Sequence, residues 1–341
     1  MTTYQKLLAD LRAEPRRWLI TGVAGFIGSH LLETLLRHDQ AVIGLDNFST
    51  GSPRNLDAVR AAVTEEQWAR FVFHQGSVAD IGICREASRD ADFVIHQAGF
   101  ISVPLSIEDP VGCHDTNVTG TLNVLVAARD NGAKRVVYAS SSAVYGDETS
   151  TPAREEKIGS PLSPYGASKA MGEMYARRFT QHYRMPTVGL RYFNIFGPRQ
   201  NPTGGYAAVI PQWIAAMIRG GECRIHGDGS ATRDFCFVAN VVQANLLAAV
   251  HEQGGRVTAP VFNVGMGGAT TIKQLHELIA QKITVAGMAK VETPQFGPER
   301  SGDILHSTAD ISAITTALHF DPEVSLDAGL EETVRWYGTE L

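Results

Sequence analysis

The chain has 341 residues, of which 44% are hydrophobic and 19% are charged, a balance typical of globular proteins. Its formal net charge of -6 argues against nucleic acid as a partner, because a surface that follows phosphates needs a basic excess. The sequence contains no apolar run long enough to span a bilayer and no N-terminal secretion signal. We therefore expect a cytoplasmic protein without a membrane partner.

The first residues place apolar side chains at helical spacing, which predicts a short amphipathic helix around Tyr4, Leu7 and Leu11. The cysteines form no C-x-x-C pair and the histidines show no metal-binding spacing, so we expect reduced thiols and no metal. The cysteines are Cys84, Cys113, Cys223 and Cys236.

Short apolar runs alternate with longer helical patterns through the first half of the chain. Each run is apolar almost throughout, as expected of strands buried on both faces of a parallel sheet. The alternation predicts repeated strand–helix–strand units and hence a doubly wound α/β (Rossmann) fold. The predicted strands lie at residues 18–20, 41–45, 71–73, 93–95, 135–139, 187–190 and 261–264.

The later part of the chain carries more Gly and Pro and shorter elements. Residues 1–193, with segments that return near 235–265, are predicted to form the domain that contains the large sheet. Residues 194–341 are predicted to form mainly a smaller domain that closes over the edge of this sheet.

A glycine-rich turn, with Gly22, Gly25 and Gly28, follows the first predicted strand and opens a helix. A pyrophosphate needs backbone N–H groups at a helix N-terminus with no side chains in the way, and glycines provide both conditions. The alternative is a strand-to-helix connection that binds nothing. The turn predicts contacts to a dinucleotide from these glycines and from Phe26 and Ile27.

Asp46 ends the second predicted strand, where a carboxylate can accept hydrogen bonds from both ribose hydroxyls of NAD. It would repel a 2′-phosphate, so the sequence predicts NAD rather than NADP, and residues 1–193 as the NAD-binding domain. The alternative is a solvated loop acid. Further cofactor contacts are predicted at Asn47, Ser49, Thr50, Gly51, Val78 and Gln97.

Tyr165 and Lys169 are four residues apart, on one face of a predicted helix. We expect the lysine ammonium, together with a nicotinamide cation, to lower the pKa of the tyrosine so that it can accept a proton near neutral pH. An ordinary exposed pair on a helix is the alternative. The serines at the end of the fifth predicted strand favour catalysis, because ligands bind at that edge of such sheets.

From residue 18 to about 310 the chain resembles the extended short-chain dehydrogenase/reductase family. The resemblance rests on the glycine turn and on the strings YASSSAVYG at 138–146 and YGASK at 165–169. In that family the catalytic Ser or Thr lies four residues before the tyrosine of the Val-Tyr-Gly string. The resemblance therefore implies Ser141, with Ser142 as the second candidate, beside Tyr165 and Lys169.

The resemblance also implies a reaction. Dehydratases of the family carry an Asp-Glu pair after the catalytic Thr, and decarboxylases carry a Glu at the second of these positions, whereas this chain has Ser142 and Ala143. These residues cannot transfer protons for elimination, which leaves 4-epimerisation of a nucleotide sugar. Tyr165 would accept the 4′-hydroxyl proton, and the hydride would pass to NAD and return to the other face of a 4-keto sugar. A net NAD(P)-dependent oxidoreductase and a non-catalytic regulator on the same fold are the alternatives.

The family's contacts to the substrate diphosphate match Asn194, Arg233 and Arg300, and guanidinium groups suit phosphate geometry. Surface ion pairs with Asp234 and Glu299 are the alternative for the two arginines. The resemblance implies further substrate contacts at Ser102, Ser141, Ser142, Tyr206, Ala208 and Val209.

Ser307 stands where UDP-galactose 4-epimerases use a tyrosine to exclude N-acetylated sugars. Residues 46–51, 102–104 and 205–211 are similar to bacterial UDP-N-acetylglucosamine 4-epimerases, which implies UDP-GlcNAc/UDP-GalNAc as the substrate pair. The chain departs from that subgroup at residues 99–101 and at Leu105, Leu305 and Ser77. A UDP-N-acetylated uronic acid, UDP-Glc and UDP-GlcA therefore stay open as substrates.

The helices expected around residues 116–130 and 167–183 resemble the pair that forms a four-helix interface across a two-fold axis in the family. This resemblance implies a homodimer.

Overall fold

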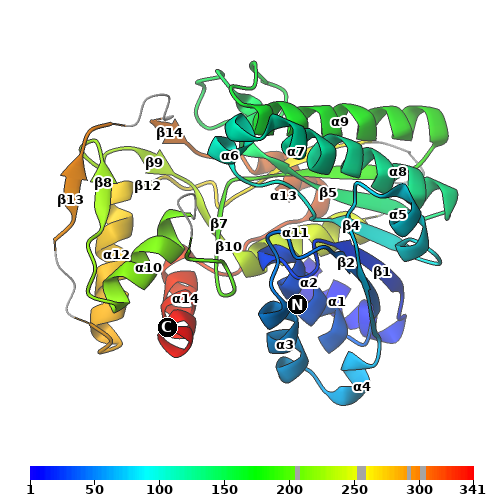
Figure 1. Ribbon diagram of the computed structural model, residues 1–341, viewed down its shortest axis with the longest axis horizontal. Coiled ribbons are helices and arrows are strands. Elements are labelled where there is room, and N and C mark those ends of the chain that lie inside the picture. The colour runs from blue at the N-terminus through cyan, green and yellow to red at the C-terminus, as the bar shows by residue number, and fades with distance from the viewer. Residues whose placement is uncertain (204–207, 252–258, 290–292, 300–304) are drawn as a thin grey trace.

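The computed structural model describes residues 1–203, 208–251, 259–289, 293–299 and 305–341. Its centre is a seven-stranded sheet in the order β11-β6-β5-β4-β1-β2-β3 (Figure 1), in which all neighbours are parallel. The predicted doubly wound α/β fold and its seven strands are confirmed. The strands are β1 (Arg17–Thr21), β2 (Ala41–Asp46), β3 (Phe71–Gln75), β4 (Phe93–His96), β5 (Arg135–Ser141), β6 (Thr187–Tyr192) and β11 (Val261–Val264).

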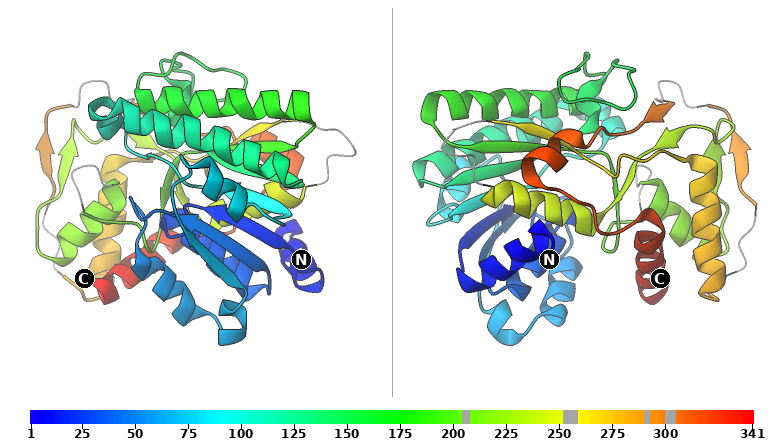
Figure 2. Two further views of the ribbon diagram at one scale, coloured as in Figure 1. Left: turned by 45° about the vertical axis from the view of Figure 1, so that its right-hand side comes forward. Right: turned by 180° about the vertical axis from the view of Figure 1, so that it is seen from behind.

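Helices cover both faces of the sheet because alternate side chains of each strand point to opposite sides. Trp18 and Ile20 pack with α1 (Thr3–Ala13), α2 (Phe26–Arg37) and α11 (Val238–Val250). Leu19, between them, packs with α5 (Ile81–Ala87), α8 (Gly120–Asp130) and α9 (Pro164–Tyr183) on the other face (Figure 2). The predicted N-terminal helix is confirmed as α1.

The remaining elements of this half are short. They are α3 (Pro53–Ala62), α4 (Glu65–Trp68), α6 (Val103–Glu108), α7 (Pro110–His114), the π-helical turn η1 (Asp115–Thr119), the 3-10 turn η2 (Ser142–Tyr145) and α13 (Ser312–Leu318). Among the described helices, no candidate for a membrane span is found.

A second group of elements lies beside the carboxyl ends of the strands, with its own apolar core around Trp213, Leu275 and Val334. Its helices are α10 (Val209–Ile218), α12 (Ile272–Val285) and α14 (Leu326–Glu340). Its strands are β7 (Asn194–Phe196), β8 (Arg224–His226), β9 (Thr232–Arg233), β10 (Phe235–Phe237), β12 (Thr270–Thr271), β13 (Gln295–Gly297) and β14 (His306–Ser307). The chain returns from this group to the large sheet through α11, β11 and α13.

Candidate active site

The glycine turn has the geometry that an anion needs. α2 begins after Gly25, which caps the helix without a side-chain hydrogen bond. A Cβ on Gly22 would lie 2.6 Å from the amide nitrogen of Ala98, and one on Gly28 would lie 2.0 Å from the carbonyl oxygen of Gly22. Only glycine fits at these positions, and the bare helix N-terminus fits the pyrophosphate of a dinucleotide. Phe26 and Ile27 form the first turn of this helix.

Asp46 ends β2 and is buried, so it is not a solvated loop acid. Its carboxylate accepts hydrogen bonds from the backbone N–H groups of Ala24 at 2.9 Å and Phe48 at 2.8 Å. Burial raises the pKa of Asp46, and these two hydrogen bonds oppose the rise. A Cβ on Gly51 would lie 3.0 Å from both carboxylate oxygens, so loop 47–51 passes directly over Asp46.

The other predicted cofactor residues lie at the same edge of the sheet. Asn47, Ser49 and Thr50 follow β2, Val78 follows β3 and is buried, and Gln97 follows β4. The side-chain amide of Gln97 donates to the hydroxyl of Tyr192 at 2.9 Å and to Oδ1 of Asn245 at 3.0 Å. Two residues of other elements thus fix its orientation.

The catalytic candidates meet where β5 ends and α9 begins. Ser141 is the last residue of β5, and its hydroxyl accepts a hydrogen bond from the amide of Ala143 at 3.1 Å. The same side chain hydrogen-bonds the Tyr165 phenol. Ser142 is the first residue of η2. Tyr165 and Lys169 lie on the first turns of α9, so the structure brings the predicted serine, tyrosine and lysine together.

The electrostatics at Tyr165 differ from the sequence-based expectation. Burial raises the pKa of Tyr165, and the Ser141 hydrogen bond opposes the rise. Burial also lowers the pKa of Lys169 to about 8, because desolvation of the ammonium outweighs the opposing effect of Cys113. The Lys169 Nζ lies 5.9 Å from the centre of the Tyr165 ring and donates to the carbonyl of Ala139 at 3.1 Å. The protein groups alone therefore raise the pKa of the phenol. The lower pKa expected from the sequence assumed a nicotinamide cation beside the phenol in addition to Lys169.

Asn117 belongs to the site but was not identified from the sequence. It lies in η1, where its side chain accepts from the amide of Phe100 at 2.8 Å and donates to the hydroxyl of Ser168 at 2.9 Å. It thus fastens the loop after β4 to α9, one residue before Lys169. A Cβ on Gly99 would lie 3.1 Å from the Lys169 Nζ, so this loop passes close to the ammonium. A π-helical turn has no sequence signal, although such turns are frequent at functional sites.

A directional chain of hydrogen bonds runs beneath the site through His96, which is buried. The hydroxyl of Thr121 donates to the carbonyl of Asn117 at 2.6 Å, so it accepts from Nε2 of His96 at 3.1 Å. Nδ1 of His96 therefore accepts from the hydroxyl of Thr21 at 2.7 Å. Burial, with Lys169 nearby, lowers the pKa of His96 to about 3, which keeps the ring neutral.

The residues of the second group of elements that are predicted to bind the substrate lie side by side. Asn194 is paired with Phe235 between β7 and β10, and Arg233 is paired with Ser307 between β9 and β14. Asp234 lies between these pairs, and its carbonyl accepts from both the backbone and the side-chain nitrogen of Asn194 at 3.1 Å. The structure thus joins three residues that are far apart in sequence.

Asp234 is fully buried and not part of an exposed ion pair. Its carboxylate accepts hydrogen bonds from the backbone of Met266 at 2.8 Å, Gly267 at 3.0 Å and Ala309 at 3.2 Å. Arg233 donates from Nη1 to the carbonyls of Thr232 at 2.9 Å and Leu305 at 3.2 Å.

The other substrate candidates are placed less closely together. Ala208 caps α10 and Val209 is its first residue. The hydroxyl of Ser102 accepts from the amide of Leu105 at 3.2 Å at the start of α6. Tyr206 and Arg300 lie outside the described residues.

Fold and site together define a Rossmann enzyme of the short-chain dehydrogenase/reductase type.

Comparison with known proteins agrees with this class. The model of the NAD dependent epimerase/dehydratase family matches residues 18–265. The chain is 35% identical to the UDP-glucose 4-epimerase of Mycolicibacterium smegmatis, over 94% of this chain and 98% of that protein.

Two solved structures are similar over nearly their whole length. One is the UDP-N-acetylglucosamine 4-epimerase of Methanobrevibacter ruminantium with UDP-N-acetylmuramic acid (34% identity, TM-score 0.86, 96% of this chain and 99% of that one). The other is the UDP-glucose 4-epimerase of Thermus thermophilus with NAD (32% identity, TM-score 0.80, 94% of this chain and 98% of that one).

The chain therefore belongs to the NAD dependent epimerase/dehydratase family. Its cofactor is NAD, and its activity is that of a nucleotide-sugar 4-epimerase. The family resemblance found in the sequence is confirmed.

Proposed function

We propose that the enzyme interconverts UDP-GlcNAc and UDP-GalNAc. The observation that carries this proposal is the place of Ser307, a small residue in register with Arg233 on the adjacent strand. Two residues further along the chain, Ala309 belongs to the same apolar cluster as Val144, which lies in the turn that follows the catalytic serine. Ser307 thus lies between the diphosphate contacts and the catalytic turn, where a small side chain leaves room for an N-acetyl group.

In this proposal each residue of the site has a separate role in binding or in proton transfer. Asn194 and Arg233, with Arg300, hold the UDP diphosphate, and Ser141 hydrogen-bonds the sugar oxygen that reacts. Tyr165 accepts the proton of the 4′-hydroxyl and returns it in the second half of the reaction. Lys169 provides a positive charge that favours the phenolate. Bound NAD, held by the glycine turn and Asp46, supplies reversible hydride transfer.

The residues after the catalytic serine support epimerisation within the family. Ser142 begins η2 and Ala143 follows it, with its amide bound to Ser141. Neither side chain is a carboxylic acid, so neither can act as the acid or base of an elimination. Proton transfer is therefore left to Tyr165, which suits oxidation and re-reduction at one carbon.

The test is an assay of the purified protein on UDP-GlcNAc, its N-acetylated uronic acid, UDP-Glc and UDP-GlcA. We expect the fastest conversion with UDP-GlcNAc, without added NAD and without net NADH production. A preference for a uronic acid would replace the substrate but keep the reaction. Steady consumption of added NADH would support a net oxidoreductase instead and contradict the proposal.

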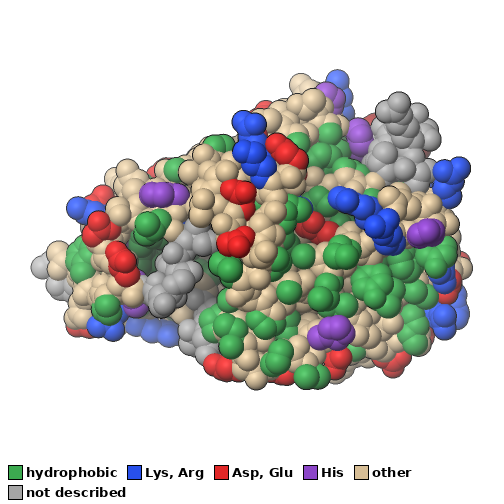
Figure 3. All heavy atoms as spheres, turned by 90° about the horizontal axis from the view of Figure 1, so that it is seen from above, with side chains coloured by type: hydrophobic (Ala, Val, Ile, Leu, Met, Phe, Trp, Pro, Cys, Tyr) green, Lys and Arg blue, Asp and Glu red, His purple; other side chains and the backbone are tan. Residues whose placement is uncertain are grey.

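We also propose a homodimer that is formed through α8 and α9. Exposed apolar residues gather on this side of the molecule, where α9 carries Met171, Met174 and Tyr175 and the adjacent α7 carries Val111 (Figure 3). Met174 is 66% exposed to solvent and Val111 is 68% exposed. Apolar side chains that gather on an exposed surface in this way indicate a contact with a partner that covers them. Light scattering at micromolar concentration should give twice the chain mass, and Met174→Glu should give a monomer. A monomeric wild-type protein would contradict the proposal.

A further inference from the structure

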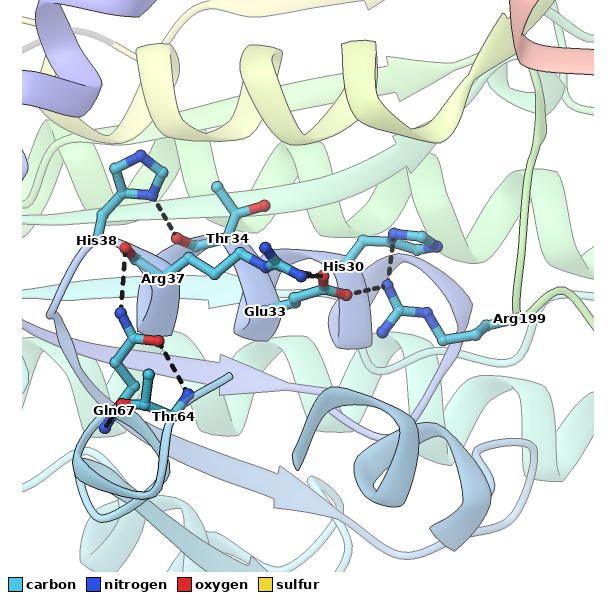
Figure 4. A network of polar contacts seen from close by, with 8 residues as sticks. All are labelled: His30, Glu33, Thr34, Arg37, His38, Thr64, Gln67 and Arg199. Atoms are coloured by element: carbon cyan, nitrogen blue, oxygen red, sulfur yellow. Dashed lines mark hydrogen bonds and ion pairs between the residues drawn. The ribbon is translucent and has the colours of Figure 1, made fainter. Parts of the chain in front are cut away.

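A buried polar cluster joins α2 to the segment that follows β7 (Figure 4). Nη2 of Arg199 donates to Nδ1 of His30 at 2.7 Å and to Oε2 of Glu33 at 2.8 Å. The Arg199 side chain is only 6% exposed. Glu33 also pairs with Arg37 one turn later, so the carboxylate has an exposed partner as well as the buried one. One guanidinium thus binds two consecutive turns of α2.

The cluster fixes the protonation of His30. A guanidinium cannot accept a hydrogen bond, so Nδ1 of His30 is the acceptor from Arg199. Nε2 therefore carries the ring hydrogen and donates it to the carbonyl of Pro198 at 3.0 Å. Burial, with Arg199 nearby, lowers the pKa of His30 to about 3, so the ring stays neutral. His30 consequently holds two adjacent residues of the segment at once.

A contact from α14 and one within the segment also hold it in place. The Tyr337 phenol of α14 donates to the carbonyl of Gln200, and the Gln200 amide donates to the carbonyl of Ile195 at 3.2 Å. Arg199 has a φ of +65°, a conformation that non-glycine residues rarely adopt. Such a conformation persists only where surrounding contacts fix it, so the segment is a rigid connection and not a flexible linker.

We propose that Arg199 is a positioning residue for the epimerase reaction, because it sets the place of Asn194 relative to α2. β7 begins at Asn194 and leads directly to Arg199, whereas α2 begins after Gly25 in the glycine turn. The contact therefore connects Asn194, which would bind the diphosphate of the substrate, to α2, whose N-terminus would bind the pyrophosphate of the cofactor. The inference rests on the proposed function, since it takes Asn194 as a contact of the UDP diphosphate. Small errors in such placement are costly, because the reacting groups must be aligned.

The experiment compares Arg199→Met with the wild-type holoenzyme. Met has a similar length but no donors, and Glu33 keeps Arg37 as its partner. We expect NAD content per chain to be unchanged, because the glycine turn is not altered. The Kd of UDP, measured by calorimetry, should rise about ten-fold or more, the scale for losing hydrogen bonds of a charged group. kcat/KM per NAD-loaded site should fall by at least the same factor.

The matched control is Arg37→Gln, which removes the exposed partner of the same glutamate. Its UDP affinity and kcat/KM should equal those of the wild type. If Arg199→Met also bound UDP and turned over like the wild type, the positioning role would be wrong and the cluster would serve stability alone. Equal losses in both variants would also overturn it.

A second variant keeps the inference testable if Arg199→Met does not fold. Tyr337→Phe removes only the hydroxyl that holds Gln200, and the Kd of UDP should rise about three-fold, with NAD retained. An unchanged Kd would contradict the inference. The wild type separates the two levels of failure. If it binds no UDP, the proposed function fails together with this inference, whereas equal UDP binding in all variants removes only the role of Arg199.

Discussion

The cofactor side and the substrate side of the active site are built in different ways. The main part of the cofactor side is one continuous stretch, from the glycine turn after β1 to the loop after β2, to which Val78 and Gln97 are added after β3 and β4. The substrate side is assembled from β7, β9, β10 and β14, which have only two or three residues each. Both sides contain a buried aspartate, Asp46 and Asp234, whose carboxylates bind backbone N–H groups.

The difference lies in what each carboxylate joins. Asp46 connects backbone within the cofactor stretch itself, which the large parallel sheet already supports. Asp234 connects the end of β9 to the turn after β11 and to Ala309, two residues after the strand that carries Ser307, segments that do not pair with one another in the large sheet. The cofactor side is thus formed largely by local order, whereas the substrate side depends on a few long-range polar contacts.

Tyr165 lies where the two sides meet, and its substitution should have the largest effect. Tyr165→Phe removes the proton acceptor but leaves the ring and both binding sites in place. We expect kcat to fall by at least ~10²-fold, the usual scale for general acid–base catalysis. The Kd of UDP and the NAD content should stay close to wild type, which calorimetry and absorbance can check. Turnover at the wild-type rate would refute the mechanism.

Substitution of each aspartate tests this difference directly. Asp234→Ala removes the acceptor of three N–H groups, of which that of Ala309 is buried and those of Met266 and Gly267 are partly buried. Because a buried N–H group without an acceptor costs about 1–3 kcal/mol, the free energy of unfolding should fall by about that amount, and UDP affinity should fall with it.

Asp46→Ala is the matched variant on the cofactor side. It should reduce NAD retention far more than UDP affinity, since it removes the predicted ribose contact. Urea unfolding, NAD content and UDP titration together separate the two patterns. If both variants lost the same ligand, the two sides would not be independent in the way that their construction indicates.

The same contrast explains how far the sequence could predict the structure. The seven strands of the large sheet were predicted because each is a buried apolar run. The glycine turn and the Tyr165 and Lys169 positions were found because their spacing is local, whereas Ser141 was implied by the resemblance to the family. β9 and β14 have two residues each and no periodicity. The Arg199 cluster and the Asn117 contacts join residues far apart in sequence, so no local pattern could show them.

Ser307 sharpens the comparison within the substrate side. Ser307→Tyr fills the space beside Arg233, and overpacking of this kind costs about 1–3 kcal/mol. We therefore expect kcat/KM on UDP-GlcNAc to fall roughly ten- to a hundred-fold, while activity on UDP-Glc is spared or raised. The measurement is the ratio of the two kcat/KM values in wild type and variant. An unchanged ratio would show that Ser307 serves only the local strand.

The smallest expected effect concerns His96, which ties the cofactor strand β1 to the helix that carries Asn117. Its folded-state pKa of about 3 lies below the ordinary value of 6.5, because burial disfavours the charged ring. Below pH 6.5 the unfolded chain binds a proton that the folded protein does not bind. The stability contribution of His96 is therefore complete above pH 6.5 and is lost as the pH falls towards 3. At pH 5 the loss is about 2 kcal/mol relative to pH 7.

His96→Gln isolates this contribution. Glutamine offers one acceptor and one donor, as the neutral ring does, but it does not titrate. The variant should be less stable than the wild type at pH 7, where the ring fits the chain of hydrogen bonds better. Its free energy of unfolding should nevertheless fall by about 2 kcal/mol less between pH 7 and pH 5. Other groups with shifted pKa values, such as His30, Asp46 and Asp234, are present in both proteins, so the difference between the two pH profiles reports His96 alone. Parallel profiles would mean that His96 already binds its proton in the folded state. Nδ1 would then donate to the Thr21 hydroxyl instead of accepting from it, while the bonds from Nε2 to Thr121 and from Thr121 to Asn117 would keep their directions.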